Sequence, residues 1–197
     1  TNLQDYTLAG LNGRELRDLT VGVIGTGRIG ATVIRDLSGF GCRILAHDLY
    51  EKEEVKQYAS YVSLEQIWKE ADVITLHTPL TSDNFHLIDK ESIAQMKDGV
   101  VIVNTARGAL IDSDVLIEAV ENGKIGAAGL DVVENEFGLY YYDHKSDILK
   151  NRELAMLRSF PNVTVSHHMA FYTRNYVETV VKDSLMSCKC FMEGKEN

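Results

Sequence analysis

The chain has 197 residues, of which 45% are hydrophobic and 25% charged, and its formal net charge at pH 7 is −9. This size and hydrophobic content predict a soluble globular protein with a substantial core, whereas the negative charge and the lack of a Lys/Arg-rich block argue against a nucleic-acid partner, because binding a phosphate backbone needs a concentrated basic surface. No stretch reaches the ~18 consecutive apolar residues of a membrane span and no secretory signal opens the chain, so we expect a cytoplasmic protein without a membrane partner.

Apolar runs of strand length recur along the chain. They are continuous rather than alternating, as expected for parallel strands that are buried on both faces. The predicted strands are Thr20–Ile24, Arg43–His47, Asp72–His77, Val100–Asn104, Ala127–Asp131 and Val163–Ser166.

Helical patterns separate these strands. The first has an apolar stripe made of Ile29, Val33, Leu37 and Phe40. Ser63 and Gln66 form a capping-box pattern at the start of a second helix. A third helix, over about residues 112–122, ends at Gly123, where a left-handed cap is expected. Strands that alternate with helices predict right-handed crossovers and an α/β, Rossmann-type doubly wound parallel sheet.

Two stretches break the alternation. Residues 132–150 have no clean period and are expected to form an irregular excursion over the surface. Beyond residue 166, the sequence predicts a long terminal helix with one stripe made of Val177, Val181, Ser184, Cys188 and Phe191.

A glycine-rich turn follows the first predicted strand at Gly25, Gly27 and Gly30. Such a pattern is weak evidence alone, but here it closes a strand and opens a helix, which is the context of a dinucleotide-binding turn. Gly25 permits the tight turn, Gly27 lets a pyrophosphate approach the backbone, and Gly30 lets helix and strand pack closely. Amides at the start of the helix attract the phosphate charge, and we expect Arg28 and Ile29 to line that contact.

Asp48 follows the second predicted strand and can accept hydrogen bonds from both hydroxyls of an adenosine ribose. Its charge would repel a 2′-phosphate, and no arginine stands at position 49 or 50 to reverse that preference. The sequence therefore predicts NAD, not NADP. A structural turn followed by a solvated carboxylate is the less favoured interpretation.

Four polar side chains lie at or beyond the expected carboxyl ends of strands, where ligands bind in an open parallel sheet. Arg107 either packs its stem over the sheet edge or faces a ligand, and the adjacent Gly108 makes us favour the ligand. Asp131 ends an apolar run, so it needs a partner. Glu136 alone would be interpreted as a surface acid, and His168 alone as a structural histidine. Together they are the candidates for the chemistry.

Five segments resemble a known family: GRELRDLTVGVIGTGRIG, ADVITLHTPL, MKDGVVIVNTARGALID, GKIGAAGLDVVENE and PNVTVSHHMAFYT. In this order they look like the cofactor-binding domain of the D-isomer-specific 2-hydroxyacid dehydrogenases. The likeness is strongest to the D-lactate dehydrogenase branch, including the vancomycin-resistance type. It covers nearly the whole chain and implies reversible hydride transfer between NADH and a small 2-oxo acid such as pyruvate.

The resemblance also implies residue roles. Arg107 would bind the 2-oxo acid and polarise its carbonyl, His168 would protonate the oxygen, and Glu136 would pair with His168. Asp131 would hold the nicotinamide end, and Phe171 would face the substrate side chain. These roles suit the chemistry, because reduction places negative charge on the carbonyl oxygen. With Arg107, the remaining residues expected to line the cofactor are Thr78, Pro79, Asn84, Thr105 and Ala106.

The catalytic histidine of this family usually follows a proline, whereas this chain has His167 at that position. The MAFYT segment that comes next selects His168. No metal site is expected on this pair, because adjacent side chains of an extended chain point apart and no spacing supplies other ligands. We interpret the remaining histidines as structural or surface residues: His47, His77, His86 and His144.

The three cysteines are odd in number and lie in apolar contexts: Cys42, Cys188 and Cys190. This usage is typical of reduced thiols in the cytoplasm rather than of a disulfide framework. We expect them to be small buried hydrophobic side chains.

The resemblance predicts a domain organisation. Residues 1–170 correspond to the NAD-binding domain, with 1–19 as a connector, and 171–197 to a terminal helix that would return to a substrate domain. The family builds that domain mainly from a preceding segment of about one hundred residues, which is not in this sequence, so a chain starting at Thr1 is expected to belong to a longer one. Half of a cleft is expected to bind NAD and turn over poorly. Family members usually pair through this domain, so we expect a homodimer.

Two functions stay open. The first is an NAD-dependent D-2-hydroxyacid dehydrogenase of which this chain is the cofactor-binding part. The second is a non-catalytic, NAD(H)-responsive binding or assembly module on the same fold. Arg107, Glu136 and His168 favour the first, whereas the missing substrate domain favours the second for this polypeptide alone.

Overall fold

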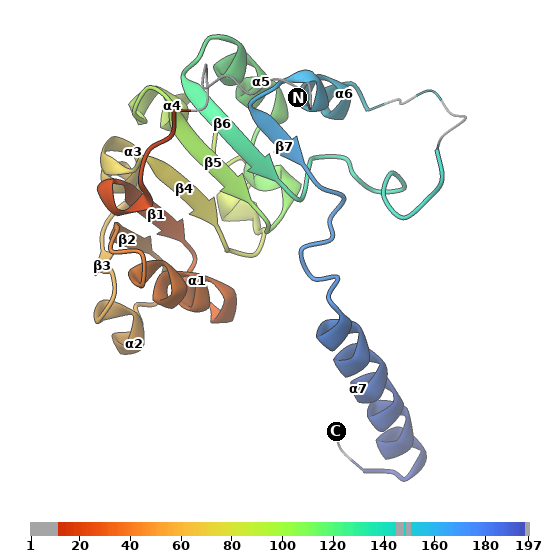
Figure 1. Ribbon diagram of the computed structural model, residues 1–197. Coiled ribbons are helices and arrows are strands. Elements are labelled where there is room, and N and C mark those ends of the chain that lie inside the picture. The colour runs from red at the N-terminus through yellow and green to blue at the C-terminus, as the bar shows by residue number, and fades with distance from the viewer. Residues whose placement is uncertain (1–11, 145–147, 149–150, 196–197) are drawn as a thin grey trace.

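The computed structural model describes residues 12–144, 148 and 151–195. Its centre is one sheet of seven parallel strands, arranged in the order β3-β2-β1-β4-β5-β6-β7 (Figure 1). The strands are β1 (Thr20–Ile24), β2 (Arg43–His47), β3 (Ser60–Tyr61), β4 (Val73–Leu76), β5 (Val100–Asn104), β6 (Ile125–Leu130) and β7 (Val163–Val165). The predicted doubly wound parallel sheet is confirmed.

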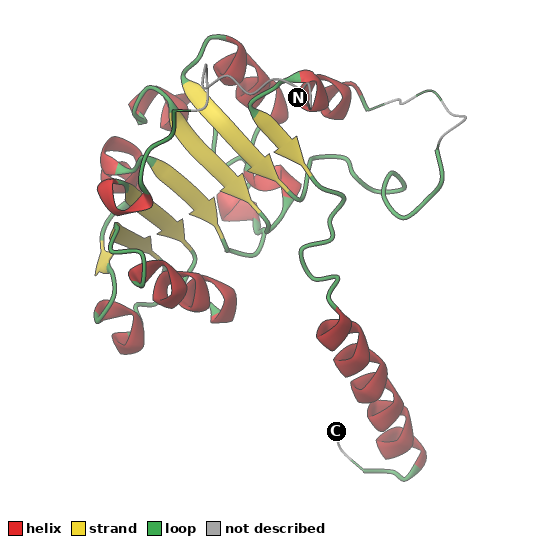
Figure 2. Cartoon of the chain, in the orientation of Figure 1, coloured by secondary structure: helices red, strands yellow, loops and turns green. Residues whose placement is uncertain are grey.

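Helices cover both faces of the sheet (Figure 2). They are α1 (Arg28–Ser38), α2 (Glu53–Lys56), α3 (Leu64–Glu70), α4 (Lys90–Gln95), α5 (Ser113–Glu121), α6 (Arg152–Ser159) and α7 (Arg174–Met192). Short 3-10 turns occupy Leu16–Asp18, Ser82–Asn84 and Gly108–Leu110.

Neighbouring strand residues belong to two different hydrophobic cores. Ile44 and Ala46 of β2 pack in the core that contains Ile34 of α1, whereas Leu45 between them packs in the core that contains Ile67 of α3. Successive side chains of a strand point to opposite faces, so both faces are buried. This explains why the strands read as continuous apolar runs.

The structure corrects the predicted stripe of α1. Ile34 is fully buried, whereas Ile29 is 67% and Phe40 61% exposed. The cause is Gly30, which packs so closely under the turn that a Cβ there would collide with the Gly25 carbonyl. The next inward position on a helix is four residues further, which is Ile34. Phe40 lies beyond the end of α1.

Two predicted helix ends are present. The Ser63 hydroxyl accepts a hydrogen bond from the Gln66 amide at 3.3 Å, although the Gln66 side chain turns to Glu70 instead of completing the capping box. After α5, Gly123 adopts a φ of +80°, the left-handed conformation expected of a residue that ends a helix.

The terminal helix α7 projects away from the sheet (Figure 1). None of its residues is buried, so the predicted stripe faces outward. The expectation of buried cysteines is wrong, because Cys188 is exposed and Cys42 and Cys190 are only half-buried. In the described part of the chain, no helix has the length and apolarity that crossing a membrane requires.

The predicted irregular stretch begins directly after β6. Residues 132–144 contain turns but neither helix nor strand, as expected, and residues 145–147 and 149–150 lie outside the described part of the chain.

Candidate cofactor and active site

The functional candidates meet at one edge of the sheet. Because all neighbouring strands pair in parallel, their carboxyl ends share that edge. It receives the glycine turn after β1, Asp48 after β2, the 104–107 loop after β5, Asp131 after β6 and the 166–170 turn after β7. Open parallel sheets bind ligands at this edge.

The turn after β1 has the geometry of a phosphate cradle. Gly25 adopts a φ of +92°, and its amide bonds the His47 carbonyl at 2.8 Å. At Gly27 a Cβ would meet no atom within 4 Å, so a ligand can approach the backbone there. Gly27 offers no side-chain cap to the first turn of α1, and Arg28 and Ile29 are exposed beside it. These residues fit a diphosphate group.

Asp48 is held in place by the turn itself. Its Oδ2 accepts hydrogen bonds from the Thr26 amide at 2.5 Å and the Thr26 hydroxyl at 2.9 Å, and the Thr26 hydroxyl accepts one from Tyr61 at 2.8 Å. Partial burial raises the pKa of Asp48, but the bonds from Thr26 and the Tyr50 amide outweigh it and hold the pKa below its ordinary value. The carboxylate is therefore charged at neutral pH and oriented before any ribose arrives.

The loop after β4 is braced by one of its own predicted site residues. The Asn84 amide donates to the Pro79 carbonyl at 2.8 Å and accepts from the Thr81 amide at 2.7 Å. Thr78 is half-buried and Pro79 exposed at the same edge. Asn84 therefore shapes this loop, and contact of Thr78, Pro79 and Asn84 with the cofactor stays a prediction.

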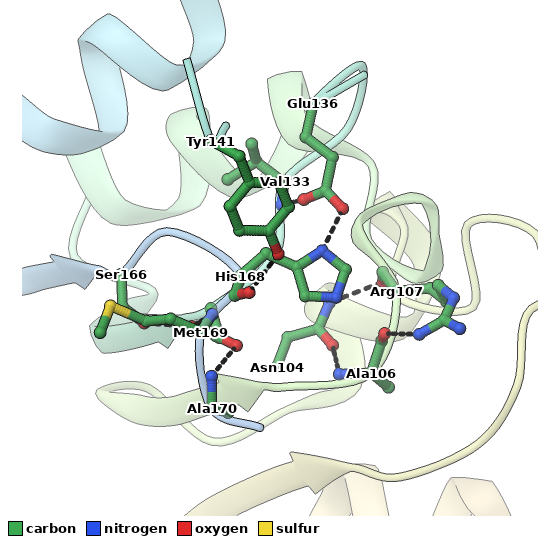
Figure 3. A network of polar contacts seen from close by, with 11 residues as sticks. Asn104, Ala106, Arg107, Val133, Glu136, Tyr141, Ser166, His168, Met169 and Ala170 are labelled. Atoms are coloured by element: carbon green, nitrogen blue, oxygen red, sulfur yellow. Dashed lines mark hydrogen bonds and ion pairs between the residues drawn. The ribbon is translucent and has the colours of Figure 1, made fainter. Parts of the chain in front are cut away.

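Asn104 fixes the loop that carries Arg107. This fully buried side chain donates to the Arg107 carbonyl at 2.9 Å and accepts from the Ala106 amide at 3.0 Å. The Arg107 guanidinium donates to the Ala106 carbonyl at 2.7 Å and points away from His168 in Figure 3. Thr105 and Arg107 are exposed, so both are open to a ligand.

Asp131 is buried and organises the turn after β7. Its carboxylate accepts hydrogen bonds from the Ser166 hydroxyl at 2.6 Å and from the Met169 and Ala170 amides at 2.9 and 2.8 Å. Its carbonyl accepts the His168 amide at 2.7 Å. The partner expected for Asp131 is thus the turn after β7. A contact with nicotinamide stays a prediction.

Glu136 and His168 lie in contact, as the resemblance implied. The imidazole Nδ1 lies 2.7 Å from Glu136 Oε1, and the other carboxylate oxygen accepts the Val133 amide at 3.1 Å (Figure 3). A carboxylate only accepts, so Nδ1 carries the proton and Nε2 is left for a ligand. His167 is exposed, with its ring 5.8 Å from that of Tyr140, so His168 is the histidine of this site.

Aromatic rings adjoin His168. The Phe171 ring stands edge-on to the imidazole with 6.4 Å between centroids, and Tyr176 lies 5.3 Å from Phe171. Phe171 is 40% exposed. That Phe171 faces the substrate side chain stays a prediction.

Of the histidines interpreted as structural or surface residues, His144 is exposed and the other three make structural contacts. His47 Nδ1 is 3.0 Å from the Val62 carbonyl, and His77 bonds Thr75 at 2.9 Å. His86 bonds Glu134 at 2.8 Å. Within the described residues, no group of three or more His, Cys, Asp or Glu side chains is arranged to hold a metal ion.

The sequence model described as "D-isomer specific 2-hydroxyacid dehydrogenase, NAD binding domain" matches residues 3–170. The chain belongs to this family. Its cofactor is NAD, as in the NAD-binding domain that defines the family. This agrees with the cradle after β1 and the carboxylate after β2.

Its relatives include enzymes with different substrates in their names. The aromatic 2-oxoacid reductase of Clostridium sporogenes is 52% identical over 190 residues, which cover 96% of this chain and 57% of that relative. A D-lactate dehydrogenase from Sporolactobacillus superposes with a TM-score of 0.93 at 39% identity, covering 98% of this chain and 59% of the other. The Aquifex aeolicus D-lactate dehydrogenase, complexed with NAD and lactic acid, superposes with a TM-score of 0.87 at 38% identity. The match covers 93% of this chain and 56% of the other. The chain thus spans little more than half of each of these relatives.

Several residues of this candidate site were not identified from the sequence. Thr26 and Tyr61 hold Asp48, Ser166 holds Asp131, and Tyr141 donates to the His168 carbonyl at 2.6 Å. Thr26 stands inside the glycine turn and Ser166 next to a predicted strand end, so position alone was a usable signal for these two. No such signal indicated Tyr141, because it lies in an irregular stretch 27 residues from its partner.

Proposed function

We propose that the protein catalyses the NAD-dependent interconversion of a 2-oxo acid and a D-2-hydroxy acid. The observation that carries this proposal is the 2.7 Å contact between Glu136 and His168 Nδ1, which leaves Nε2 available at the edge where the cofactor cradle lies. A histidine oriented in this way by a carboxylate is a typical general acid and base.

Reduction adds a hydride to the carbonyl carbon and a proton to the carbonyl oxygen. Bound NADH supplies the hydride. The protonated His168 donates its Nε2 proton to the oxygen. It keeps its Nδ1 proton, which it donates in a hydrogen bond to Glu136, so the imidazole leaves the step neutral and correctly oriented. In the reverse direction, neutral Nε2 accepts the hydroxyl proton.

Arg107 is the proposed substrate-binding cation. Its guanidinium matches a carboxylate in geometry and charge, and it is exposed beside the Asn104-braced loop. Because it now bonds the Ala106 carbonyl, substrate binding would exchange that bond for one to the acid. Removing the side chain is therefore expected to raise KM strongly.

Two substrate classes have support. Relatives named D-lactate dehydrogenase favour a small 2-oxo acid such as pyruvate. The Phe171 and Tyr176 rings beside His168, together with the 52% identical aromatic 2-oxoacid reductase, favour an aromatic 2-oxo acid such as phenylpyruvate. Aromatic rings pack edge-to-face with such a side chain.

An NADH oxidation assay on the full-length protein with pyruvate, 2-oxobutyrate and phenylpyruvate tests the proposal. Consumption of NADH with one of them, and its loss in His168→Ala, is the expected result. Tight NADH binding without oxidation by any acid would refute the dehydrogenase proposal and favour the non-catalytic, NAD(H)-responsive module.

We also infer the setting in which the protein works. Residues 1–170 are proposed as the NAD-binding domain and 171–197 as the helix that returns to a substrate domain. The lack of buried residues in α7 supports this division.

The exposed apolar side chains of α7 also support a homodimer. A monomer in light scattering would contradict it. Three free cysteines support a cytoplasmic location.

A further inference from the structure

Three short hydrogen bonds from three different residues converge on His168. Its amide donates to the Asp131 carbonyl at 2.7 Å, its Nδ1 meets Glu136 at 2.7 Å, and its carbonyl accepts the Tyr141 hydroxyl at 2.6 Å. Figure 3 shows Glu136 and Tyr141 both reaching His168 from the segment that follows β6. The proposed function rests on the bond to Glu136 and does not use the other two.

The backbone at His168 needs such support. His168 has a φ of +50° and Tyr141 a φ of +69°, so both ends of the hydroxyl-to-carbonyl bond lie in the left-handed region that residues other than glycine rarely adopt. Conformations of this kind persist only where surrounding contacts determine them, and they gather at functional sites.

We propose that Tyr141 is a positioning residue, whose hydroxyl fixes the His168 peptide and thereby aims the imidazole at the substrate. This rests on the proposed function, in which His168 is the proton donor. Glu136 fixes the ring and Tyr141 fixes the backbone from which the ring extends. Glu136 and Tyr141 both belong to the segment that follows β6, so the placement of this segment sets the direction in which Nε2 points.

Burial argues that the contribution of Tyr141 is local. The side chain is 71% exposed, so its ring adds little to the hydrophobic core, and the bond to His168 is the specific contact of its hydroxyl. Tyr142 is a matched control, because it is adjacent and 70% exposed, and its hydroxyl makes no hydrogen bond to the described residues.

The test compares Tyr141→Phe with Tyr142→Phe in the full-length protein. In Tyr141→Phe, kcat falls about tenfold while the Kd for NADH and the melting temperature stay unchanged, since misplacing a catalytic group costs turnover rather than cofactor binding. Tyr142→Phe keeps the kcat of the unmodified protein.

A second readout does not depend on activity. In protein labelled with ¹⁵N-histidine, the Nδ1 proton of His168 gives a resonance that reports its bond to Glu136, with Glu136→Gln identifying the signal. We expect Tyr141→Phe to shift and broaden this resonance by faster exchange with water, and Tyr142→Phe to leave it in place.

An unchanged kcat and an unchanged resonance in Tyr141→Phe would overturn the proposal, as would equal losses in both variants. If the unmodified protein oxidises NADH with no 2-oxo acid but the resonance still responds to Tyr141→Phe alone, the positioning role holds and the proposed function fails.

Discussion

Replacing Asp131 by asparagine is expected to lower the free energy of unfolding by about 3 kcal/mol at pH 7. Asparagine preserves the shape, and its carbonyl can still accept from the Ser166 hydroxyl and the Met169 amide, which both bond Oδ1. Its NH2 group, however, faces the Ala170 amide that donates to Oδ2. One partly buried donor therefore loses its acceptor, at about 1–3 kcal/mol, and the two remaining hydrogen bonds no longer go to a charged acceptor.

The loss depends on pH in a definite direction. Burial raises the pKa of Asp131, but the bonds from Ser166, Met169 and Ala170, with the nearby His168 ring, outweigh it and hold the pKa below its ordinary value. A lowered pKa means that the stabilisation is fully present above the unfolded value of about 3.9 and is lost as the pH falls through the folded value. The difference in free energy of unfolding between the unmodified protein and Asp131→Asn is therefore expected to narrow below about pH 4.

Urea denaturation from pH 7 to about pH 3 measures this difference. Asp36→Asn is the control, because that side chain is 68% exposed at the surface of α1 and its replacement is expected to cost less than about 0.5 kcal/mol. An Asp131→Asn effect as small as that of the control, or one that does not change with pH, would refute the hydrogen-bond argument.

Three further predictions follow from individual contacts. The buried Tyr140 hydroxyl has no partner among the described residues, so Tyr140→Phe is expected to stabilise the protein by about 1 kcal/mol, seen as a melting temperature higher by ~2–4 °C; a lower one would contradict this. Asp48→Asn weakens NADH binding about tenfold in calorimetric titration, because the ribose loses a charged acceptor, and equal affinity would show that Asp48 does not bind it. Glu136→Gln lowers kcat by about 10²-fold at unchanged NADH affinity, whereas unaltered turnover would remove Glu136 from the mechanism.

Much of the fold was predictable because both faces of the sheet are buried. Continuous apolar runs located six of the seven strands to within a few residues. The strand that was missed, β3, has only Ser60 and Tyr61, pairs at the sheet edge and is too short to leave a pattern. The predicted stripe of α1 failed because apolar spacing alone does not show which face packs, and Gly30 decides that here.

The site was predictable where chemistry follows a strand end. Asp48, Arg107, Asp131 and His168 all follow strands whose carboxyl ends meet at one edge, so their gathering follows from parallel pairing. Their precise partners did not follow. The pairing of Glu136 with His168 came from the resemblance. No local sequence pattern predicts that Arg107 donates a hydrogen bond to the neighbouring Ala106 carbonyl.

Every proposed role depends on a dinucleotide lying along the carboxyl edge of the sheet, so calorimetric titration of the folded chain with NADH is the decisive measurement. We expect saturable binding of one NADH per chain and much weaker binding of NADPH, because the charged Asp48 repels a 2′-phosphate. Folded protein that binds neither dinucleotide, or binds both equally well, would contradict it.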